Sequence, residues 1–292
     1  MLNFKEITAK DYDIFKRYLN NIGQNSCENA FVNMLIWQKA YNNMYAIEKG
    51  QLIIKSGVGE DETFRLPMGD NFELGMELIK TYCKDKKPYF YVQEGERLDR
   101  FLSFYANEYD IEEHRNAFDY LYLSENLAYL SGKKYHSKRN HISSFSRKFD
   151  WRYEKITAEN VGKIKECAKK WYIENDYLSD KYLPFEKQGV ELLLSDIGAF
   201  GVKGGAIFVG EEVVAFTLGS QINEKVFDVH IEKALSDYSG AYAVINNQFV
   251  KNELMEYEYI NREDDMGLEG LRKAKLSYKP SILLKKYFCS AR

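Results

Sequence analysis

The sequence has no long uncharged apolar run. No segment approaches about 18 consecutive apolar residues, the length at which a membrane-spanning helix becomes a candidate. The opening stretch, MLNFKEITAKDYD, carries acidic residues and lacks the apolar core of a secretory signal. We therefore expect no transmembrane segment and no secretory leader.

Cysteine is also scarce. The four thiols (Cys27, Cys83, Cys167 and Cys289) lie far apart in the sequence, and no two of them form a C-x-x-C pair. This spacing is not that of a disulfide framework, and it gives no zinc-binding pattern. We expect buried, reduced thiols, a cytoplasmic location and no metal centre.

The sequence lacks a net positive charge. Its 41 lysines and arginines are outnumbered by 44 acidic residues, for a net charge of −3. The surface as a whole is therefore not that of a DNA-binding or anionic-membrane-binding protein. One segment reverses this balance: SGKKYHSKRNHISSFSRKF, residues 131–149, holds six Lys or Arg and two His without any acid. It is either a solvated linker helix that lies over a sheet or a segment that faces phosphates.

The sequence does contain a repeat. FKEITAKDYDIFKRYL (residues 4–19) and YEKITAENVGKIKECA (residues 153–168) each combine an aromatic residue, a charged pair, Ile-Thr-Ala and an apolar helical period. Repetition at half the chain length indicates two copies of one domain, and 292 residues suit about two domains. We predict an N-terminal domain over 1–124, a basic linker helix over 125–150 and a C-terminal domain over 151–292.

The second half has a readable order of elements. A strand and two helices come first, and GGAIFVGEEVVAFTLGSQI is a hairpin that turns at 210–212. VFDVHIE alternates as a strand, a Gly-containing turn leads into a helix over 244–254, and a strand, a helix and a last strand, SILLKKYF, follow. The first half is a looser copy, with a hairpin on Lys49-Gly50 and a helix over 96–109. This order predicts an α+β protein with mixed sheets.

Several sequence motifs, in the order in which they occur, resemble those of a known family. They are ENAFVNMLIWQKAY, GKKYHSKRNHISSF, VHIEKAL, YAVINNQF and REDDMGLEGLRKAKLSYKP. Across essentially the whole chain, they resemble the bacterial proteins that share the C-terminal domain of phosphatidylglycerol lysyltransferase. The resemblance implies two tandem GNAT (acyl-CoA N-acyltransferase) domains, each a mixed, mostly antiparallel sheet flanked by helices. It also implies a relationship to the Fem-type aminoacyl transferases.

The resemblance implies where a donor would bind. A GNAT fold splays two parallel strands around the donor's acyl arm and holds the donor's phosphates on backbone N–H groups at a helix N-terminus. Here the strands would end at 230–232 and at Asn261, and the cofactor-binding turn would be Ser239, Gly240 and Ala241. Asp237 departs from the family pattern, because a carboxylate at this turn repels a diphosphate. Acyl-coenzyme A and aminoacyl-tRNA both stay open as donors.

Three residues are candidates for proton transfer. Glu232, at a strand end, is a candidate base that acts through water, and His230 is a candidate base or a satisfied core histidine. Tyr278 follows the last helix, where GNAT enzymes often place an acid for the leaving group; the alternative is an ordinary packed tyrosine.

A second group is predicted to bind substrates. Asp264 and Asp265 either capture an amine, with Asn261 nearby, or cap the helix that follows them. Lys138 and Arg139 are candidates for docking tRNA. Arg272 and Lys275 either face the donor's phosphates or belong to a helix stabilised by a Glu269–Lys273 pair.

We therefore expect an acyltransferase that moves an acyl or aminoacyl group to an amine or hydroxyl of a small-molecule, peptide or lipid acceptor. The alternative is a catalytically silent GNAT-fold protein that senses a nucleotide or acyl ligand. Such a sensor could lose Glu232 and Tyr278 without penalty. The sequence does not name the donor, the acceptor or the oligomeric state.

Overall fold

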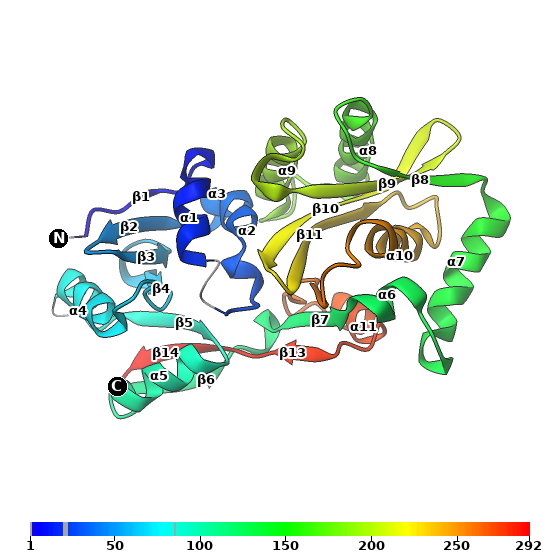
Figure 1. Cartoon of the computed structure of the whole chain (residues 1–292). Helices are drawn as coiled ribbons and strands as arrows, with labels where there is room; N and C mark the ends of the chain where they lie inside the picture. The colour runs from blue at the N-terminus through cyan, green and yellow to red at the C-terminus, as the bar shows by residue number, and fades with distance from the viewer. Residues whose placement is uncertain (1, 20–22, 85) are drawn as a thin grey trace.

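Two seven-stranded sheets flanked by helices make up the chain, in a computed structural model that describes residues 2–19, 23–84 and 86–292 (Figure 1). The N-terminal sheet has the order β1 (Lys5–Glu6), β2 (Met44–Glu48), β3 (Gln51–Ser56), β4 (Thr63–Phe64), β5 (Tyr89–Gln93), β14 (Lys286–Ala291) and β6 (Tyr109–Glu113). Only β4 and β5 run parallel among these described strands.

The C-terminal sheet has the same topology. From one edge to the other it contains β8 (Trp151–Lys155), β9 (Lys203–Val209), β10 (Glu212–Asn223), β11 (Val226–Ala234), β12 (Tyr259–Asn261), β7 (Asp119–Leu123) and β13 (Ile282–Leu284). Its parallel pair, β11 and β12, occupies the fourth and fifth positions, as β4 and β5 do in the other sheet. The prediction of an α+β fold with two mixed, mostly antiparallel sheets is confirmed.

The repeated Ile-Thr-Ala words occupy equivalent places. Ile7 and Ile156 directly follow β1 and β8, and each side chain is only 3% exposed. The backbone N–H of Thr8 donates to Asp11 Oδ2 (2.8 Å), and that of Thr157 donates to Asn160 Oδ1 (2.9 Å). In both copies, the threonine N–H donates to the side chain three residues later in the sequence, at the start of the first helix. The duplication inferred from sequence is therefore confirmed.

Each half donates its last strand to the sheet of the other half. β7 lies between β12 and β13 in the C-terminal sheet, whereas β14 lies between β5 and β6 in the N-terminal sheet. The segment SILLKKYF, predicted as one strand, is therefore shared: 282–284 pair with β7 and 286–291 pair with β5 and β6. The domain boundaries at 124 and 150 stay a prediction, and the exchanged strands interlock the two sheets across these positions.

Helices cover both faces of the sheets. They are α1 (Tyr12–Leu19), α2 (Phe31–Ile36), α3 (Gln38–Tyr41), α4 (Phe72–Cys83), α5 (Glu96–Tyr105), α6 (Ser124–Tyr129), α7 (His136–Lys148), α8 (Val161–Glu174), α9 (Leu183–Leu193), α10 (Ala241–Glu253) and α11 (Glu269–Leu276). In the C-terminal half, α8 and α9 pack on one face of the sheet, and α10 packs on the other with α7 beside it (Figure 1). The predicted 96–109 helix ends at Tyr105, because Tyr109 begins β6.

Candidate active site

The parallel strands β11 and β12 separate where the sequence predicts a splayed pair. Val226, Phe227 and Asp228 pair with Tyr259, Ile260 and Asn261. Beyond that point, β11 continues along β10 as far as Ala234, whereas the chain leaves β12 at Asn261. Glu232 on one side and Arg262 on the other therefore face each other past the point of separation.

Glu232 and Arg262 form a nearly buried ion pair. Arg262 Nη2 lies 2.6 Å from Glu232 Oε1, and Asn246 Nδ2 donates to Glu232 Oε2 (3.1 Å). Two buried polar atoms, Arg262 Nη1 and Asn246 Oδ1, have no hydrogen-bond partner among the residues that the structure describes. Unsatisfied buried donors and acceptors are rare in native proteins and often mark the place of a water or a ligand.

Aromatic rings and an amine lie against this pair. The Arg262 guanidinium lies 4.8 Å from the ring centroid of Tyr278, and Lys138 Nζ from α7 lies 3.8 Å from the same centroid. Burial lowers the pKa of Lys138 to about 8, and the charge of Arg262 adds to this shift. Burial raises the pKa of Tyr278 to about 12. At neutral pH, Tyr278 is therefore a proton donor, and part of Lys138 is a neutral amine.

His230 belongs to a different cluster. Its Nδ1 lies 3.3 Å from Asp228 Oδ2 and 3.2 Å from Glu263 Oε1, and its Nε2 lies 2.8 Å from Ser220 Oγ. Burial alone would lower the pKa of His230, but the charge of Asp228 and its contact with Glu263 raise it to about 9. A charged imidazole cannot accept a proton, so this geometry does not support His230 as a base.

The two aspartates predicted to capture an amine are engaged within the protein. The fully buried Asp265 accepts hydrogen bonds from Arg272 (2.7 and 2.8 Å), Arg115 (3.2 Å) and the Tyr120 hydroxyl (2.5 Å). Asp264 Oδ1 accepts from the N–H of Met266 (2.9 Å). No hydrogen bond or ion pair among the described residues joins either aspartate to Tyr278 or Glu232, so capture of an amine by Asp264 and Asp265 stays a prediction.

The other predicted substrate-binding residues also form hydrogen bonds within the protein. Lys275 Nζ donates to the carbonyl oxygens of Arg262 and Asp264, which fixes the loop after β12. Arg272 is bound by Asp265 and by Asn116 Oδ1 (2.8 Å). Asn261 Nδ2 donates to Asp119 Oδ2 and to the carbonyl of Asn25, both at 2.9 Å. A role of Arg272, Lys275 and Asn261 in binding substrate stays a prediction.

The predicted cofactor turn lies against α7. Gly240 has φ +99°, and a Cβ built on it would lie 2.9 Å from the carbonyl oxygen of His141 and 3.3 Å from Phe145 Cβ. Ala241, the first residue of α10, is buried, whereas Ser239 is exposed. A diphosphate at Ser239, Gly240 and Ala241 would therefore compete with α7 for the space around this turn.

The six Lys and Arg side chains of residues 131–149 fall into two groups: two contact other residues of the protein, and four are exposed. Arg139 donates to the carbonyls of Leu130 and Gly132 and so caps the end of α6, and Lys138 is half-buried over Tyr278. The remaining four cations are exposed; they are Lys133, Lys134, Arg147 and Lys148. The segment lies along one end of the C-terminal sheet (Figure 1).

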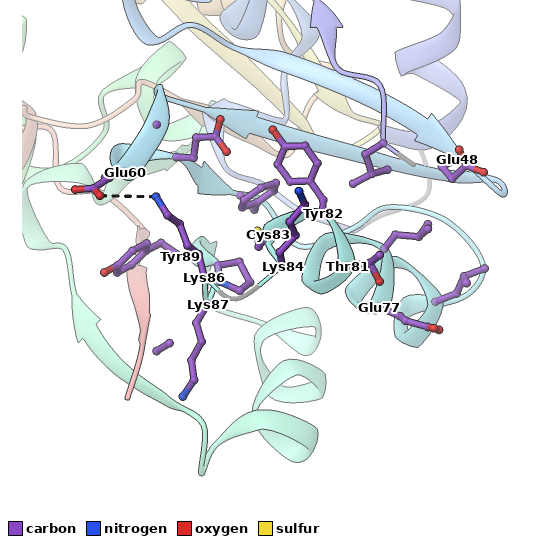
Figure 2. Close-up of a pocket in the computed structure, with 18 of the residues that line it drawn as sticks. Glu48, Glu60, Glu77, Thr81, Tyr82, Cys83, Lys84, Lys86, Lys87 and Tyr89 are labelled. Atoms are coloured by element: carbon purple, nitrogen blue, oxygen red, sulfur yellow. Dashed lines mark ion pairs between the residues drawn. The ribbon is translucent and has the colours of Figure 1, made fainter.

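A groove of about 1130 Å³ lies beside α4, away from these residues. Its walls carry both signs of charge, and Lys86 reaches Glu60 at 3.7 Å (Figure 2). A smaller groove of about 390 Å³ lies between α1, α2 and the end of β10, and Ser220 is part of its lining. No residue predicted to be catalytic lines either groove.

Arg262 and Asn246 are functional candidates that sequence reasoning missed. The signal for Arg262 was available, because it directly follows the predicted strand end at Asn261 in REDDMG. Nothing in the sequence marks Asn246, which reaches Glu232 only through the packing of α10.

The two sheets, each with a parallel pair in the same position, define a protein of tandem GNAT-like fold. Residues 19–290 match the family described as "Phosphatidylglycerol lysyltransferase, C-terminal", and the chain belongs to this family. Family and fold relate it to lysylphosphatidylglycerol synthetases and to Fem proteins.

Solved structures agree with this assignment. A conserved protein of unknown function from Bacteroides thetaiotaomicron is 32% identical, with a TM-score of 0.91 over 100% of both chains. The C-terminal domain (DUF2156) of a protein named as a lysylphosphatidylglycerol synthetase from Agrobacterium fabrum is 14% identical, with a TM-score of 0.67 over 96% of this chain and 91% of that one. FemX is 8% identical, with a TM-score of 0.56 over 99% and 97%. The last two likenesses concern the fold alone.

One curated relative also matches. An uncharacterized protein of Mycoplasmoides gallisepticum is 25% identical over 193 residues, which span 64% of this chain and 60% of that protein. Across residues 2–19, 23–84 and 86–292, every helix is too short or too polar to cross a membrane.

Proposed function

We propose that this protein transfers an aminoacyl group from aminoacyl-tRNA to an amine or hydroxyl acceptor, at the point where β11 and β12 separate. The observation that carries the proposal is Arg262, whose unpartnered Nη1 lies among Glu232, Tyr278 and Lys138. Membership of the phosphatidylglycerol lysyltransferase C-terminal family supports aminoacyl transfer over other acyl transfers.

The four side chains suit the chemistry of ester aminolysis or transesterification. The acceptor's lone pair forms a bond to the ester carbonyl carbon, and neutral Lys138 takes the acceptor's proton. Arg262 stabilises the oxyanion that forms, while Glu232 holds the guanidinium in place. The bond from the carbonyl carbon to the ribose oxygen then breaks, and the Tyr278 phenol supplies a proton to that oxygen.

The proposed donor follows from the surroundings of the site. Gly240 packs against His141 and Phe145 of α7, and exposed Asp237 lies beside the turn; both features disfavour the diphosphate of coenzyme A. A tRNA needs a basic surface outside the reaction site, and Lys133, Lys134, Arg147 and Lys148 supply exposed cations on the segment that carries Lys138.

Binding of tRNA should depend steeply on salt. The logarithm of affinity should fall linearly with the logarithm of salt concentration, by about 0.7 to 0.9 per neutralised phosphate. Replacing Lys133, Lys134, Arg147 and Lys148 by Glu should weaken binding and flatten the slope in a filter-binding titration. The matched control replaces two exposed lysines of α8, Lys165→Glu and Lys169→Glu, and should change neither. Equal loss in the control, or salt-insensitive binding of acyl-coenzyme A without tRNA affinity, would refute this donor.

Transfer should also depend on pH through Lys138. The amine must be neutral to take a proton, and its pKa is lowered to about 8, so the rate should rise as pH rises through that value. Lys138→Arg keeps the charge but cannot deprotonate, and it should remove this rise between about pH 7 and pH 9. Lys169→Arg is the control. A tRNA that binds without turnover at any pH would favour the sensor alternative.

A further inference from the structure

An open groove runs along one face of α4 in the N-terminal half (Figure 2). Leu74, Leu78 and Tyr82 line it at a spacing of four residues, so they form one stripe along the helix. Each of these three side chains is partly exposed. The Tyr82 ring is held in place by Phe4, which meets it edge-on at 4.9 Å between ring centroids. The groove therefore has an apolar floor that follows the axis of α4.

The C-terminal half has an equivalent helix. α4 connects β4 to β5, and α10 connects β11 to β12, so each helix joins the two parallel strands of its sheet. Counted from the first residue of each helix, Leu78 corresponds to Asn247. Thr81 corresponds to Val250 in the same way. The groove face of α4 is therefore the counterpart of the α10 face that carries Asn247 and Val250.

On α10, this face is covered by the segment that follows β7. Asn247 Nδ2 donates to the carbonyl oxygens of Leu127 (2.8 Å) and Ala128 (2.7 Å), both of which belong to α6. Val250 is 0% exposed and lies in one core cluster with the same two residues. On α4, the corresponding side chains line the open groove instead. A helical face that is buried against α6 in one half is thus open in the other, and the repeat indicates that this face suits a second helix.

We propose that the groove face of α4 binds α4 of a second copy of this chain, in an antiparallel pair around a two-fold axis near Thr81. Such an interface is isologous, because the same surface serves both copies. An axis near Thr81 places Leu78 of each copy against Tyr82 of the other, so the apolar stripe is self-complementary. Two helices packed in this way lie about 8–10 Å apart. Each α4 then covers the other as α6 covers α10.

The charges beside the stripe favour the antiparallel direction. Glu77 and Lys84 both line the groove, and neither side chain has a hydrogen bond or an ion pair with a described residue. In the antiparallel pair, Glu77 of each copy lies opposite Lys84 of the other. A parallel pair would instead bring Glu77 beside Glu77 and Lys84 beside Lys84, and like charges at a contact are unfavourable. Antiparallel helices also place opposite ends of their dipoles side by side.

The balance of charge in the groove favours a second copy over a strongly charged partner. The lining holds four lysines and four glutamates. A nucleic acid or an anionic membrane would meet the glutamates as well as the lysines, which opposes binding. A second copy presents the same balance, with the two signs in reverse order along the antiparallel helix.

The test measures self-association of the full chain by sedimentation equilibrium between about 1 and 100 µM, where we expect a dimer. Leu78→Asp puts a charge in the apolar stripe and should weaken the dimer by at least about 30-fold. Glu77→Lys places a lysine opposite Lys84 and should weaken it by about 10-fold. Combining Glu77→Lys with Lys84→Glu restores opposite charges and should recover most of the affinity. The matched control, Leu192→Asp, changes an exposed leucine of α9 and should leave the dimer unchanged.

Each possible outcome decides the proposal. A wild-type chain that stays monomeric would overturn it, even if its groove binds a helix of another protein. A dimer that survives Leu78→Asp, with the variant folded by circular dichroism, would use another surface and would also overturn it. Should Leu78→Asp fail to fold, the charge exchange decides, because Glu77 and Lys84 are exposed. A double exchange that recovers nothing would refute the antiparallel pair. These results are independent of aminoacyl transfer, since Glu232, Arg262, Tyr278 and Lys138 lie outside the groove lining.

Discussion

Replacing Arg262 by lysine should lower the rate of aminoacyl transfer by about 10²- to 10³-fold, the usual effect of losing an oxyanion donor. Arg262 pairs with Glu232 through Nη2, and its Nη1 has no hydrogen-bond partner among the described residues. One guanidinium can therefore hold Glu232 and still donate to a carbonyl oxygen. A lysine retains the charge but presents a single compact ammonium, which cannot hold Glu232 and donate to a carbonyl oxygen in the same geometry. Single-turnover transfer from charged tRNA measures the effect.

The control for this variant is Arg152→Lys. Arg152 is an exposed arginine of β8 that pairs with Glu154, and its replacement should leave the rate unchanged. Both proteins should melt within a few degrees of the wild type. A wild-type rate for Arg262→Lys would remove Arg262 from the mechanism and leave the site without its proposed electrophile.

Replacing Lys286 by methionine should lower the free energy of unfolding by about 3–5 kcal/mol, as expected when one partner of a buried ion pair is removed. Lys286 is 0% exposed and lies 2.7 Å from Asp119 and from Glu28. Asp119 opens β7 and Lys286 opens β14, so this pair joins the two exchanged strands where they cross. Methionine leaves the buried carboxylate of Asp119 and the partly buried carboxylate of Glu28 without the Lys286 ammonium. Urea denaturation measures the loss.

The chain supplies a matched control at the next residue. Lys285→Met removes a lysine whose partner, Glu113, is half-exposed, so the loss should be much smaller than that of Lys286→Met. Adding Asp119→Asn to Lys286→Met should recover part of the stability, because it removes one of the unpaired charges. Equal losses for the Lys285 and Lys286 variants would show that the crossing point contributes little.

Local patterns predicted much of the fold. The hairpin at 210–212 follows from turn chemistry, and the Thr8 and Thr157 entries follow from capping chemistry repeated at half the chain length. The end of the helix at Tyr105 was missed, because Leu98, Phe101, Tyr105 and Tyr109 keep a helical spacing. The pairing of Tyr109 with Ala291 on β14 decides that boundary, and no local pattern contains it.

The exchange of strands could not be predicted for the same reason. β7 and β14 are the equivalent seventh strands of two copies, and either sheet has a position for either strand. The choice depends on contacts made after folding, such as that between Asp119 and Lys286.

The candidate site was predicted in part. Glu232 and Tyr278 lie in one cluster around Arg262, but His230 does not join them. Two residues along a strand span about 6.6 Å, which is enough to place His230 with Asp228 and Glu263 instead. The predicted proton-transfer residues were an acid, a histidine and a tyrosine, because these side chains titrate. Arg262 and Asn246 stand out for another reason: each has a buried side-chain atom without a hydrogen-bond partner among the described residues.

The position of β14 has a consequence for protein synthesis. β14 fills the gap between β5 and β6, so the N-terminal sheet stays open there until residues 286–291 have left the ribosome. The half that is translated first is therefore the half that is completed last. During most of elongation, the facing edges of β5 and β6 have unpaired backbone groups that invite pairing with other nascent chains. In the native protein, β14 closes both of these edges.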